Sequence, residues 1–164
     1  MNMKIHLIVI LLGILALAAF PKPLMAQALP DTTGIADALI LEAEKHLGKP
    51  YRWAADGPEA FDCSGFIKYV FARSGITLPR VSEQQFKAGE PIEDVQELRK
   101  GDIVFFGKKR SIRQIGHVGI VTEVDLMRAS FRFIHCSESE GVHESDCNSS
   151  SYYLMRYMGA RRVF

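Results

Sequence analysis

The sequence has few cysteines, a single tryptophan and almost no net charge. Three cysteines and one tryptophan occur among 164 residues, and 20 Lys and Arg residues against 19 Asp and Glu residues give a formal net charge of +1. A chain without an excess of either charge has no general attraction for polyanions, so we expect no binding to nucleic acid. Internal repeats and low-complexity stretches are also lacking. The 48% of hydrophobic residues are enough for the core of one ordinary globular domain.

The first 26 residues have the pattern of a secretory signal peptide. Lys4 gives a short positive region, an apolar run spans residues 5–20, and the small residue Ala26 precedes a possible cut. The run is shorter than the ~20 apolar residues that a membrane-spanning helix needs, which favours cleavage over an uncleaved anchor. We therefore expect an exported protein, periplasmic or extracellular. Residues 27–164 would form a single domain, with no stable membrane anchor after cleavage.

Cys63 lies where a predicted loop turns into a predicted helix. Asp62 is a good N-cap residue, because its carboxylate can accept hydrogen bonds from unpaired backbone N–H groups. Apolar residues then recur at helical spacing and a glycine follows at the expected C-cap: Phe66, Ile67, Val70, Phe71 and Gly75. Backbone N–H groups and the helix dipole lower the pKa of a thiol in this position, which predicts a reactive cysteine. The alternative is a buried structural cysteine.

Two further helices are predicted, one on each side of the Cys63 helix. The first follows a cap at residues 31–33 and ends at Gly48, and its inner face is expected to contain Ile35, Leu39 and Ala43. We expect His46, near its end, at the surface. Residues 82–85 read Ser-Glu-Gln-Gln, a capping-box pattern that predicts a short third helix.

After Gly101 the spacing of apolar residues changes to that of strands. The basic stretch 108–113 is expected to be a loop between the first two strands. Helices followed by a run of strands indicate an α+β fold, with the N-terminal helices packed on an antiparallel sheet of about five to six strands. The predicted strands are residues 102–106, 117–124, 131–136, 141–143 and 157–164.

His117 and His135 fall on neighbouring predicted strands, which can place them side by side on one face of a sheet. His135 would then hold one ring nitrogen of His117 and leave the other to face Cys63, giving a nucleophile, a base and an orienting group. Strand alternation sends Cys136 to the opposite face, and His143 is a weaker competitor for the third position. For either histidine alone, a half-buried structural role is the alternative. The spacing of the three residues is not that of a zinc site, so we expect no metal.

Cys136 and Cys147 leave a second question open. If they form a disulfide, Cys63 remains as the free thiol of an exported protein. The alternative is two unpaired, partly buried thiols, and spacing alone does not decide between them.

Together these segments resemble the NlpC-type family of bacterial cell-wall cysteine peptidases, which are papain-like in fold. The similarity runs from about Ile35 to the C-terminus. It departs from the family in a longer stretch between Val121 and Phe133, expected to alter a loop near the site, and in Cys136, where the family has a small residue. The segments that carry the resemblance are 48–51, 62–66, 78–80 with Ser82 and Gln85, 101–106, 117–120, 133–135 and 159–163.

The resemblance implies roles for particular residues. Cys63 would be the nucleophile, His117 the base and His135 the orienting third residue. Tyr51, beside the cysteine, would help to stabilise the oxyanion. Ser82 is alternatively only a helix cap, and Trp53 alternatively covers the core. The residues implied or considered as lining the substrate cleft are Asp62, Ser64, Arg80, Ser82 and Trp53.

The implied function is a secreted peptidoglycan endopeptidase. It would hydrolyse an amide bond of the stem peptide, between γ-D-glutamate and a diamino acid, through a thioester on Cys63. Peptidoglycan stem peptides would be its partner, no cofactor is expected, and the protein would be a monomer. The alternatives are a papain-like amidase or acyltransferase acting on another small peptide or a lipid, and a catalytically silent wall-binding module. Reaction products separate hydrolysis from acyl transfer.

Overall fold

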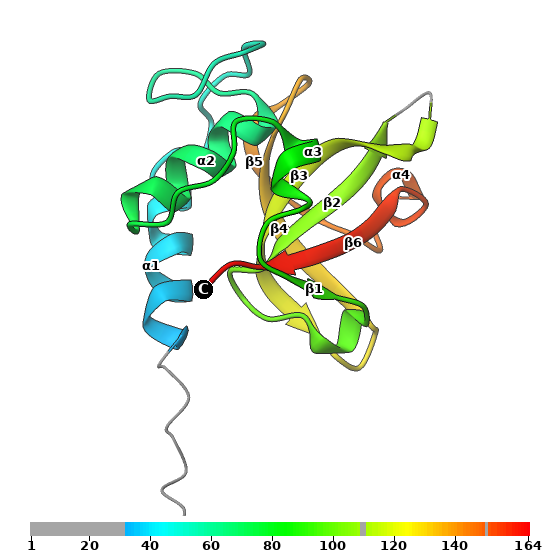
Figure 1. Cartoon of the computed structure of the whole chain (residues 1–164). Helices are drawn as coiled ribbons and strands as arrows, with labels where there is room; N and C mark the ends of the chain where they lie inside the picture. The colour runs from blue at the N-terminus through cyan, green and yellow to red at the C-terminus, as the bar shows by residue number, and fades with distance from the viewer. Residues whose placement is uncertain (1–31, 109–110, 150) are drawn as a thin grey trace, which may run out of the picture.

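The computed structural model describes residues 32–108, 111–149 and 151–164. The expected signal peptide, residues 1–26, lies outside them. Figure 1 shows two helices, α1 and α2, lying together beside an antiparallel sheet of six strands. The strand order is β1-β6-β2-β3-β4-β5, and each neighbouring pair is antiparallel. The predicted α+β class, with N-terminal helices packed on an antiparallel sheet of about five to six strands, is confirmed.

The predicted strands correspond to β2 to β6, and the predicted helices to α1 to α3. Three short elements were not predicted: β1 at the edge of the sheet, the single 3-10 turn η1, and α4, one turn of helix between β5 and β6. Each is too short to show an apolar period. In chain order the elements are α1 (Thr32–Glu44), α2 (Cys63–Arg73), α3 (Ser82–Gln85), β1 (Glu90–Ile92), η1 (Val95–Glu97), β2 (Ile103–Lys108), β3 (Ser111–Asp125), β4 (Ser130–Ser137), β5 (Gly141–Asp146), α4 (Ser151–Leu154) and β6 (Tyr157–Arg162).

The inner face of α1 differs from the prediction by one position. Leu39 and Ala43 are buried as expected, but Ile35 is 37% exposed and Ala36 is buried in its place. His46 is also buried, so its predicted surface position is wrong. The chain leaves the helix at Glu44 and turns the imidazole between Phe61 and Tyr69, with ring centroids 5.2 and 5.1 Å away. Packing the imidazole between two aromatic rings is more favourable than exposing it to water.

The start of α3 also differs from the prediction. The N-cap residue is Val81, and Ser82 is already the first helical residue, with its Oγ 3.4 Å from Glu83 Oε2. The predicted capping box, which begins at Ser82, is therefore wrong, because the helix is capped one residue earlier. What anchors this short helix is Gln85, whose buried Nε2 donates to Ser64 O (3.0 Å) and Pro79 O (2.9 Å).

The sheet has an apolar core on each face. One core lies between the sheet and the helices, where α1 and α2 meet alternate residues of β2, β3 and β4, among them Phe105, Val118 and Ile134. The other core covers the opposite face and contains Phe106, Phe133 and Cys147. Alternation along a strand explains the division, because neighbours in sequence point to opposite faces. None of the helices in the described ranges is long and apolar enough to cross a membrane.

The β3–β4 hairpin accounts for the longer stretch between Val121 and Phe133. Both strands continue away from the histidines, from Gly119 paired with His135 to Asp125 paired with Ser130. Six residues at ~3.3 Å each carry the turn ~20 Å from that pair. The expectation that these residues alter a loop near the site is therefore wrong. The basic loop expected at 108–113 is mostly strand, because β3 begins at Ser111; its residues 109–110 lie outside the described ranges.

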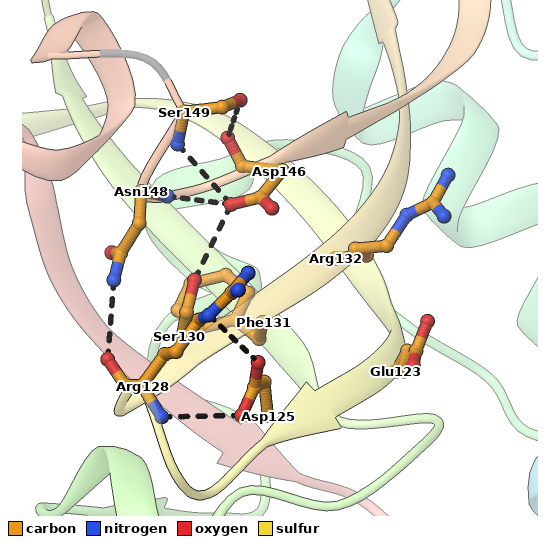
Figure 2. A pocket seen from close by; sticks show the side chains of 9 residues that line it. All are labelled: Glu123, Asp125, Arg128, Ser130, Phe131, Arg132, Asp146, Asn148 and Ser149. Atoms are coloured by element: carbon orange, nitrogen blue, oxygen red, sulfur yellow. Dashed lines mark hydrogen bonds and ion pairs between the residues drawn. The ribbon is translucent and has the colours of Figure 1, made fainter.

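A surface pocket of about 400 Å³ lies at this distant end of the hairpin. Figure 2 shows that its polar side chains bond to one another: Asp146 Oδ1 accepts from Ser130 Oγ and from the backbone N–H groups of Asn148 and Ser149. Arg128 likewise pairs with Asp125. The pocket is built by turn contacts, and we assign it no role.

A buried ion pair ties β6 to the start of β2. Asp102 is 0% exposed, and its carboxylate accepts from Arg162 Nε (2.8 Å), Arg162 Nη2 (2.7 Å) and the backbone N–H of Arg99 (2.6 Å). Removing one partner of such a pair leaves a buried charge without compensation.

We predict that Arg162→Ala lowers the free energy of unfolding by about 3 kcal/mol. Lys100→Ala is the matched control, because Lys100 pairs with Asp37 at an exposed site and such pairs contribute less than about 1 kcal/mol. Urea unfolding of both variants measures the difference. Equal, small effects would show that the Asp102 pair does not stabilise the sheet.

Candidate active site

Cys63 is the first residue of α2, and Asp62 caps that helix as predicted. Asp62 Oδ1 accepts from the backbone N–H of Gly65 at 2.7 Å. The apolar face of the helix is buried, which holds its N-terminus against the sheet, and Cys63 itself is half-buried. The helix packs on β3 and β4, the strands that carry His117 and His135.

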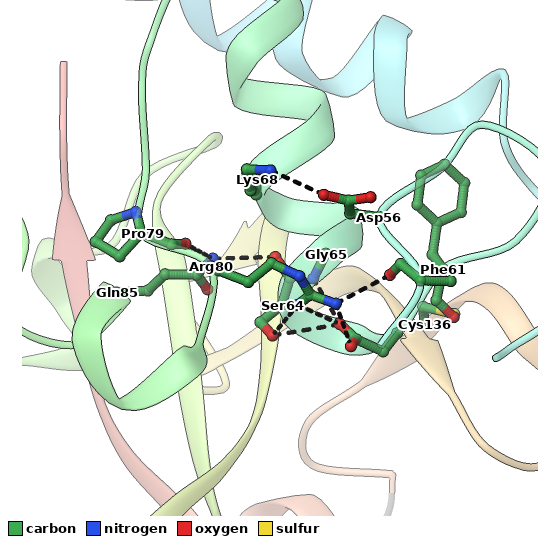
Figure 3. A network of polar contacts seen from close by, with 11 residues as sticks. Asp56, Phe61, Ser64, Gly65, Lys68, Pro79, Arg80, Gln85 and Cys136 are labelled. Atoms are coloured by element: carbon green, nitrogen blue, oxygen red, sulfur yellow. Dashed lines mark hydrogen bonds and ion pairs between the residues drawn. The ribbon is translucent and has the colours of Figure 1, made fainter. Parts of the chain in front are cut away.

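Arg80 holds the same cap from the other side. Its guanidinium donates to Asp62 Oδ1 (3.0 Å) and Oδ2 (2.6 Å), in the paired geometry that arginine and carboxylate groups prefer. Further bonds reach Ser64 Oγ (3.2 Å) and Ala55 O (3.3 Å). Figure 3 shows Arg80, Ser64 and Gly65 gathered at the start of the helix. The sequence-predicted residues Asp62, Ser64 and Arg80 are thus brought together.

Gly65 allows the preceding loop to lie directly on the helix. A Cβ at this position would stand 2.2 Å from Ala55 O, which no side chain can accommodate. The same carbonyl accepts from the backbone N–H of Asp62 at 2.8 Å. The Asp-Cys-Ser-Gly sequence therefore specifies a tight corner and the helix start together.

Tyr51 reaches this corner from the loop before it. It forms an isolated bridge with Phe61 and packs, with Cys63, against the core between helices and sheet. Burial, and then the nearby Cys63, raise the pKa of Tyr51 to about 12, so its hydroxyl keeps its proton and can donate a hydrogen bond. Trp53 is 81% exposed, so its alternative role as a cover for the core is wrong. Ser82 is buried.

His117 and His135 meet on adjacent strands as predicted. His117 Nε2 lies 2.8 Å from His135 Nδ1, and the rings are nearly perpendicular. The contact is possible because Gly119 stands opposite His135 in the register, and a Cβ there would lie 2.6 Å from the Phe133 ring. The bond occupies one nitrogen of His117 and leaves Nδ1 without a hydrogen-bond partner among the described residues. That Nδ1 faces Cys63 stays a prediction.

His143, the weaker candidate for the third position, makes its polar contacts with residues other than His117. His143 lies beside His135 on β5, with ring centroids 4.2 Å apart. Its Nδ1 donates to Gly141 O at 3.0 Å, and its Nε2 lies 3.7 Å from Glu140 Oε1. The nitrogen that meets His117 therefore belongs to His135.

Two residues at this site were not predicted. Ser145 Oγ lies 3.0 Å from His135 Nε2, and Tyr153 packs its ring on both imidazoles. Ser145 lies in the half of β5 beyond the predicted hairpin return, and Tyr153 lies in α4, which shows no period. A polar residue two positions after His143 on an extended β5 was the available signal for Ser145.

The pKa of the Cys63 thiol is raised, whereas the sequence analysis predicted that it would be lowered. Burial raises it to about 11, and the adjacent Asp62 carboxylate adds to the effect. Backbone hydrogen bonds at the helix start and the charge of Arg80 lower the thiol pKa, as predicted, but their effects are smaller than that of burial. Desolvation disfavours the thiolate more than the helix N-terminus favours it.

Burial acts on the histidines in the opposite sense. It lowers the pKa of His117 to about 4, with His143 as a second cause, and it lowers the pKa of His135 further. A buried imidazole loses hydration of its charged form. At neutral pH the site therefore holds a neutral thiol and neutral imidazoles.

The other cysteines lie on opposite faces of the sheet. Cys136 belongs to the core beneath the helices, where its thiol donates to Phe61 O at 3.3 Å, and Figure 3 shows the two residues together. Cys147 belongs to the other core. All three cysteines are free, so of the two alternatives left open by the sequence, Cys136 and Cys147 are the unpaired thiols and do not form a disulfide. The prediction that Cys136 faces away from His135 agrees with this placement, since His135 stacks on Phe133. Among the residues that the structure describes, no three His, Cys, Asp or Glu side chains are grouped as ligands for a metal ion.

Comparison with known proteins gives one family and several longer relatives. The model of the NlpC/P60 family matches residues 48–162. A probable endopeptidase p60 from Listeria innocua is 53% identical over 79 residues, covering 48% of this chain and 17% of the relative. A γ-D-glutamyl-L-lysine dipeptidyl-peptidase from Bacillus cereus is 34% identical over 130 residues, covering 79% of this chain and 37% of the relative.

The solved structures include an NlpC/P60 family protein from Bacillus cereus. It is 34% identical, with a TM-score of 0.69, and the match covers 77% of this chain and 39% of that one. The chain therefore spans less than half the length of each of these three proteins.

We predict that the buried histidines make stability fall in acid. Because the folded-state pKa of His117 is about 4 and its ordinary value is 6.5, the unfolded chain binds the proton first as the pH falls between these values. The stability present above pH 6.5 is thus lost by about pH 4, by roughly 3 kcal/mol from His117. Urea unfolding of the wild type and His117→Asn across this range should show curves that converge in acid. Parallel curves would contradict the buried neutral imidazole.

Proposed function

Since the chain belongs to the NlpC/P60 family, we propose that it is a secreted cysteine peptidase that hydrolyses an amide bond in peptidoglycan stem peptides. The observation that carries the proposal is the 2.8 Å contact between His117 Nε2 and His135 Nδ1, on strands that pack against the helix beginning at Cys63. A base oriented by a third group beside a nucleophile is the arrangement of covalent catalysis.

In the proposed mechanism, His117 takes the proton of the Cys63 thiol as the thiolate attacks the carbonyl carbon. A neutral thiol and a neutral imidazole suit this order, because the proton moves when the substrate arrives. His117 then gives the proton to the leaving amine, and the acyl part remains on Cys63 as a thioester. A water molecule that loses a proton to His117 releases the acid and restores the thiol.

We assign the oxyanion to the Cys63 backbone N–H and the Tyr51 hydroxyl. The first N–H groups of a helix have no partner within it and point to the site where negative charge develops. Tyr51 is supported as a donor because its raised pKa keeps the phenol protonated.

Some of the proposed cleft residues shape the cleft, and others contact the substrate. Asp62, Ser64 and Arg80 bond to one another, so we propose that the buried Asp62 and Ser64 shape the subsite and that the partly exposed Arg80 contacts the stem peptide. Ser82 is buried, so we assign it no contact with the substrate. Trp53, which projects from the loop that precedes Cys63, is the apolar surface available to a substrate.

The bond we propose is the one between γ-D-glutamate and a diamino acid. The activity in the name of the Bacillus cereus relative, a γ-D-glutamyl-L-lysine dipeptidyl-peptidase, supports this choice. Digestion of purified muropeptides by the mature protein, with products identified by mass spectrometry, tests it. Stems cut after γ-D-glutamate are expected. Cleavage at the crosslink between stems would show that the protein hydrolyses a different bond from the one proposed. An acylated amine as product would favour the acyltransferase alternative.

We predict that Cys63→Ala lowers kcat by at least about 1,000-fold and leaves the fold intact, because the nucleophile is lost. His135→Ala should be milder than His117→Ala, at about 10- to 100-fold, because it orients the base without transferring the proton itself. Steady-state hydrolysis of a muropeptide measures all three. A kcat for Cys63→Ala above about a thousandth of the wild-type value, or a larger effect at His135 than at His117, would refute the assigned roles.

We predict that Trp53→Ala lowers kcat/KM by about 5- to 30-fold, mainly through KM, which corresponds to about 1 to 2 kcal/mol. An exposed side chain contributes little to folding, so the unfolding midpoint should not move. Met127→Ala is the matched control, because Met127 is 96% exposed at the distant hairpin turn. The role of Trp53 is disproved by kinetics that match those of the control.

A further inference from the structure

Ser145 lies on the edge of the His135 ring that is turned away from His117. His135 Nδ1 contacts His117 Nε2 at 2.8 Å, and His135 Nε2 contacts Ser145 Oγ at 3.0 Å. His135 is fully buried, so water does not compete for either nitrogen. The three side chains form one chain of hydrogen bonds that ends at the serine hydroxyl.

Two arrangements of protons fit this chain. A neutral imidazole carries a proton on one nitrogen only. If His135 carries it on Nε2 and donates to Ser145, His135 Nδ1 accepts from His117 Nε2–H and His117 Nδ1 is left as a base. If Ser145 donates to His135 Nε2, His135 Nδ1–H donates to His117 Nε2. His117 then carries its proton on Nδ1, and that nitrogen cannot take the proton of a thiol.

Only the first arrangement supports the reaction. A protonated His117 donates from both nitrogens, so the nitrogen of His135 that meets it must be an acceptor. In the second arrangement, protonation of His117 would bring two N–H groups face to face at 2.8 Å. The proton on His135 Nε2 must therefore have an acceptor in the buried site, and Ser145 Oγ is the atom that stands there.

Tyr153 supports the serine in this position. Burial raises the pKa of Tyr153 to about 12, and a side-chain hydrogen bond with Ser145 acts in the opposite direction. The Tyr153 ring also lies against His117, His135 and Phe133, with the His135 centroid 5.3 Å away. When the Ser145 O–H donates to Tyr153, the lone pairs of the Ser145 oxygen stay available to accept from His135 Nε2–H.

We propose that Ser145 is a positioning residue that selects the tautomer of His135, and through it the tautomer of His117, so that His117 Nδ1 is free to act as the base. This inference rests on the proposed function for its catalytic consequence. The choice between the two arrangements also rests on that function, whereas the proton positions themselves can be measured in the resting protein whether or not it turns over a substrate.

Nitrogen-15 NMR of the histidine-labelled full chain tests the proton positions directly. The wild type and Ser145→Thr should show His135 protonated at Nε2, and Ser145→Ala should show a population protonated at Nδ1. His135→Gln assigns the signal. An Nδ1 proton in the wild type, or the same tautomer with and without the serine hydroxyl, overturns the proposal.

Hydrolysis of a muropeptide tests the consequence. Ser145→Ala should lower kcat by about 10- to 100-fold with little change in KM, and Ser145→Thr should restore it, because threonine keeps the acceptor. Ser130→Ala is the matched control, since it removes a serine that bonds Asp146 at the distant end of the hairpin. Full activity in Ser145→Ala, or no rescue by threonine in a protein that remains folded, overturns the inference.

The two proposals fail in different ways. If the wild type cuts no muropeptide but His135 carries its proton on Nε2 only when residue 145 has a hydroxyl, the proposed function fails and the tautomer assignment stands. If the wild type cuts and Ser145→Ala cuts equally well, the function stands and the role of Ser145 fails.

Discussion

The pairing of Asp62 with Arg80 is the interaction on which the candidate site depends. The carboxylate caps α2 through Gly65, accepts both arms of the guanidinium, and thereby joins the helix to the connector that precedes α3. Arg80 also holds the loop through Ala55 O. Three segments separated in sequence are thus tied to the residue before Cys63, which places the thiol at a defined point against the sheet. Because Arg80 stays partly exposed, we read this pair as a device that fixes geometry more than one that adds stability.

The same burial that places the groups also keeps them neutral. It raises the pKa of the Cys63 thiol to about 11 and lowers that of His117 to about 4, so neither is charged at rest. In our account the charge is created when the substrate binds, and the contacts among His117, His135 and Ser145 stabilise it on the imidazole side. Low polarity strengthens those hydrogen bonds once the proton has moved.

Motifs with a local cause were predictable from the sequence. The Asp62 cap, the helix after Cys63, the strands and the meeting of His117 with His135 all follow from spacing and alternation. The predictions that failed depended on tertiary surroundings. The thiol pKa was predicted wrongly because residue spacing does not report burial. The burial of His46, the exposure of Trp53 and the direction of the long β3–β4 hairpin could not be predicted, because a loop aromatic can face the core or the solvent and the length of a segment does not say where it extends. Ser145 and Tyr153 were missed because short elements carry no period.

The rate of alkylation of Cys63 by iodoacetamide, followed against pH and located by peptide mass mapping, tests the central claim most directly. That claim is a neutral Cys63 thiol and a neutral His117 imidazole in the resting protein. The account predicts a rate that keeps rising above about pH 9, as it does for a thiol with a raised pKa. A rate that reaches a plateau with a midpoint below about pH 7 would reveal a thiolate already paired with protonated His117, and would contradict the account.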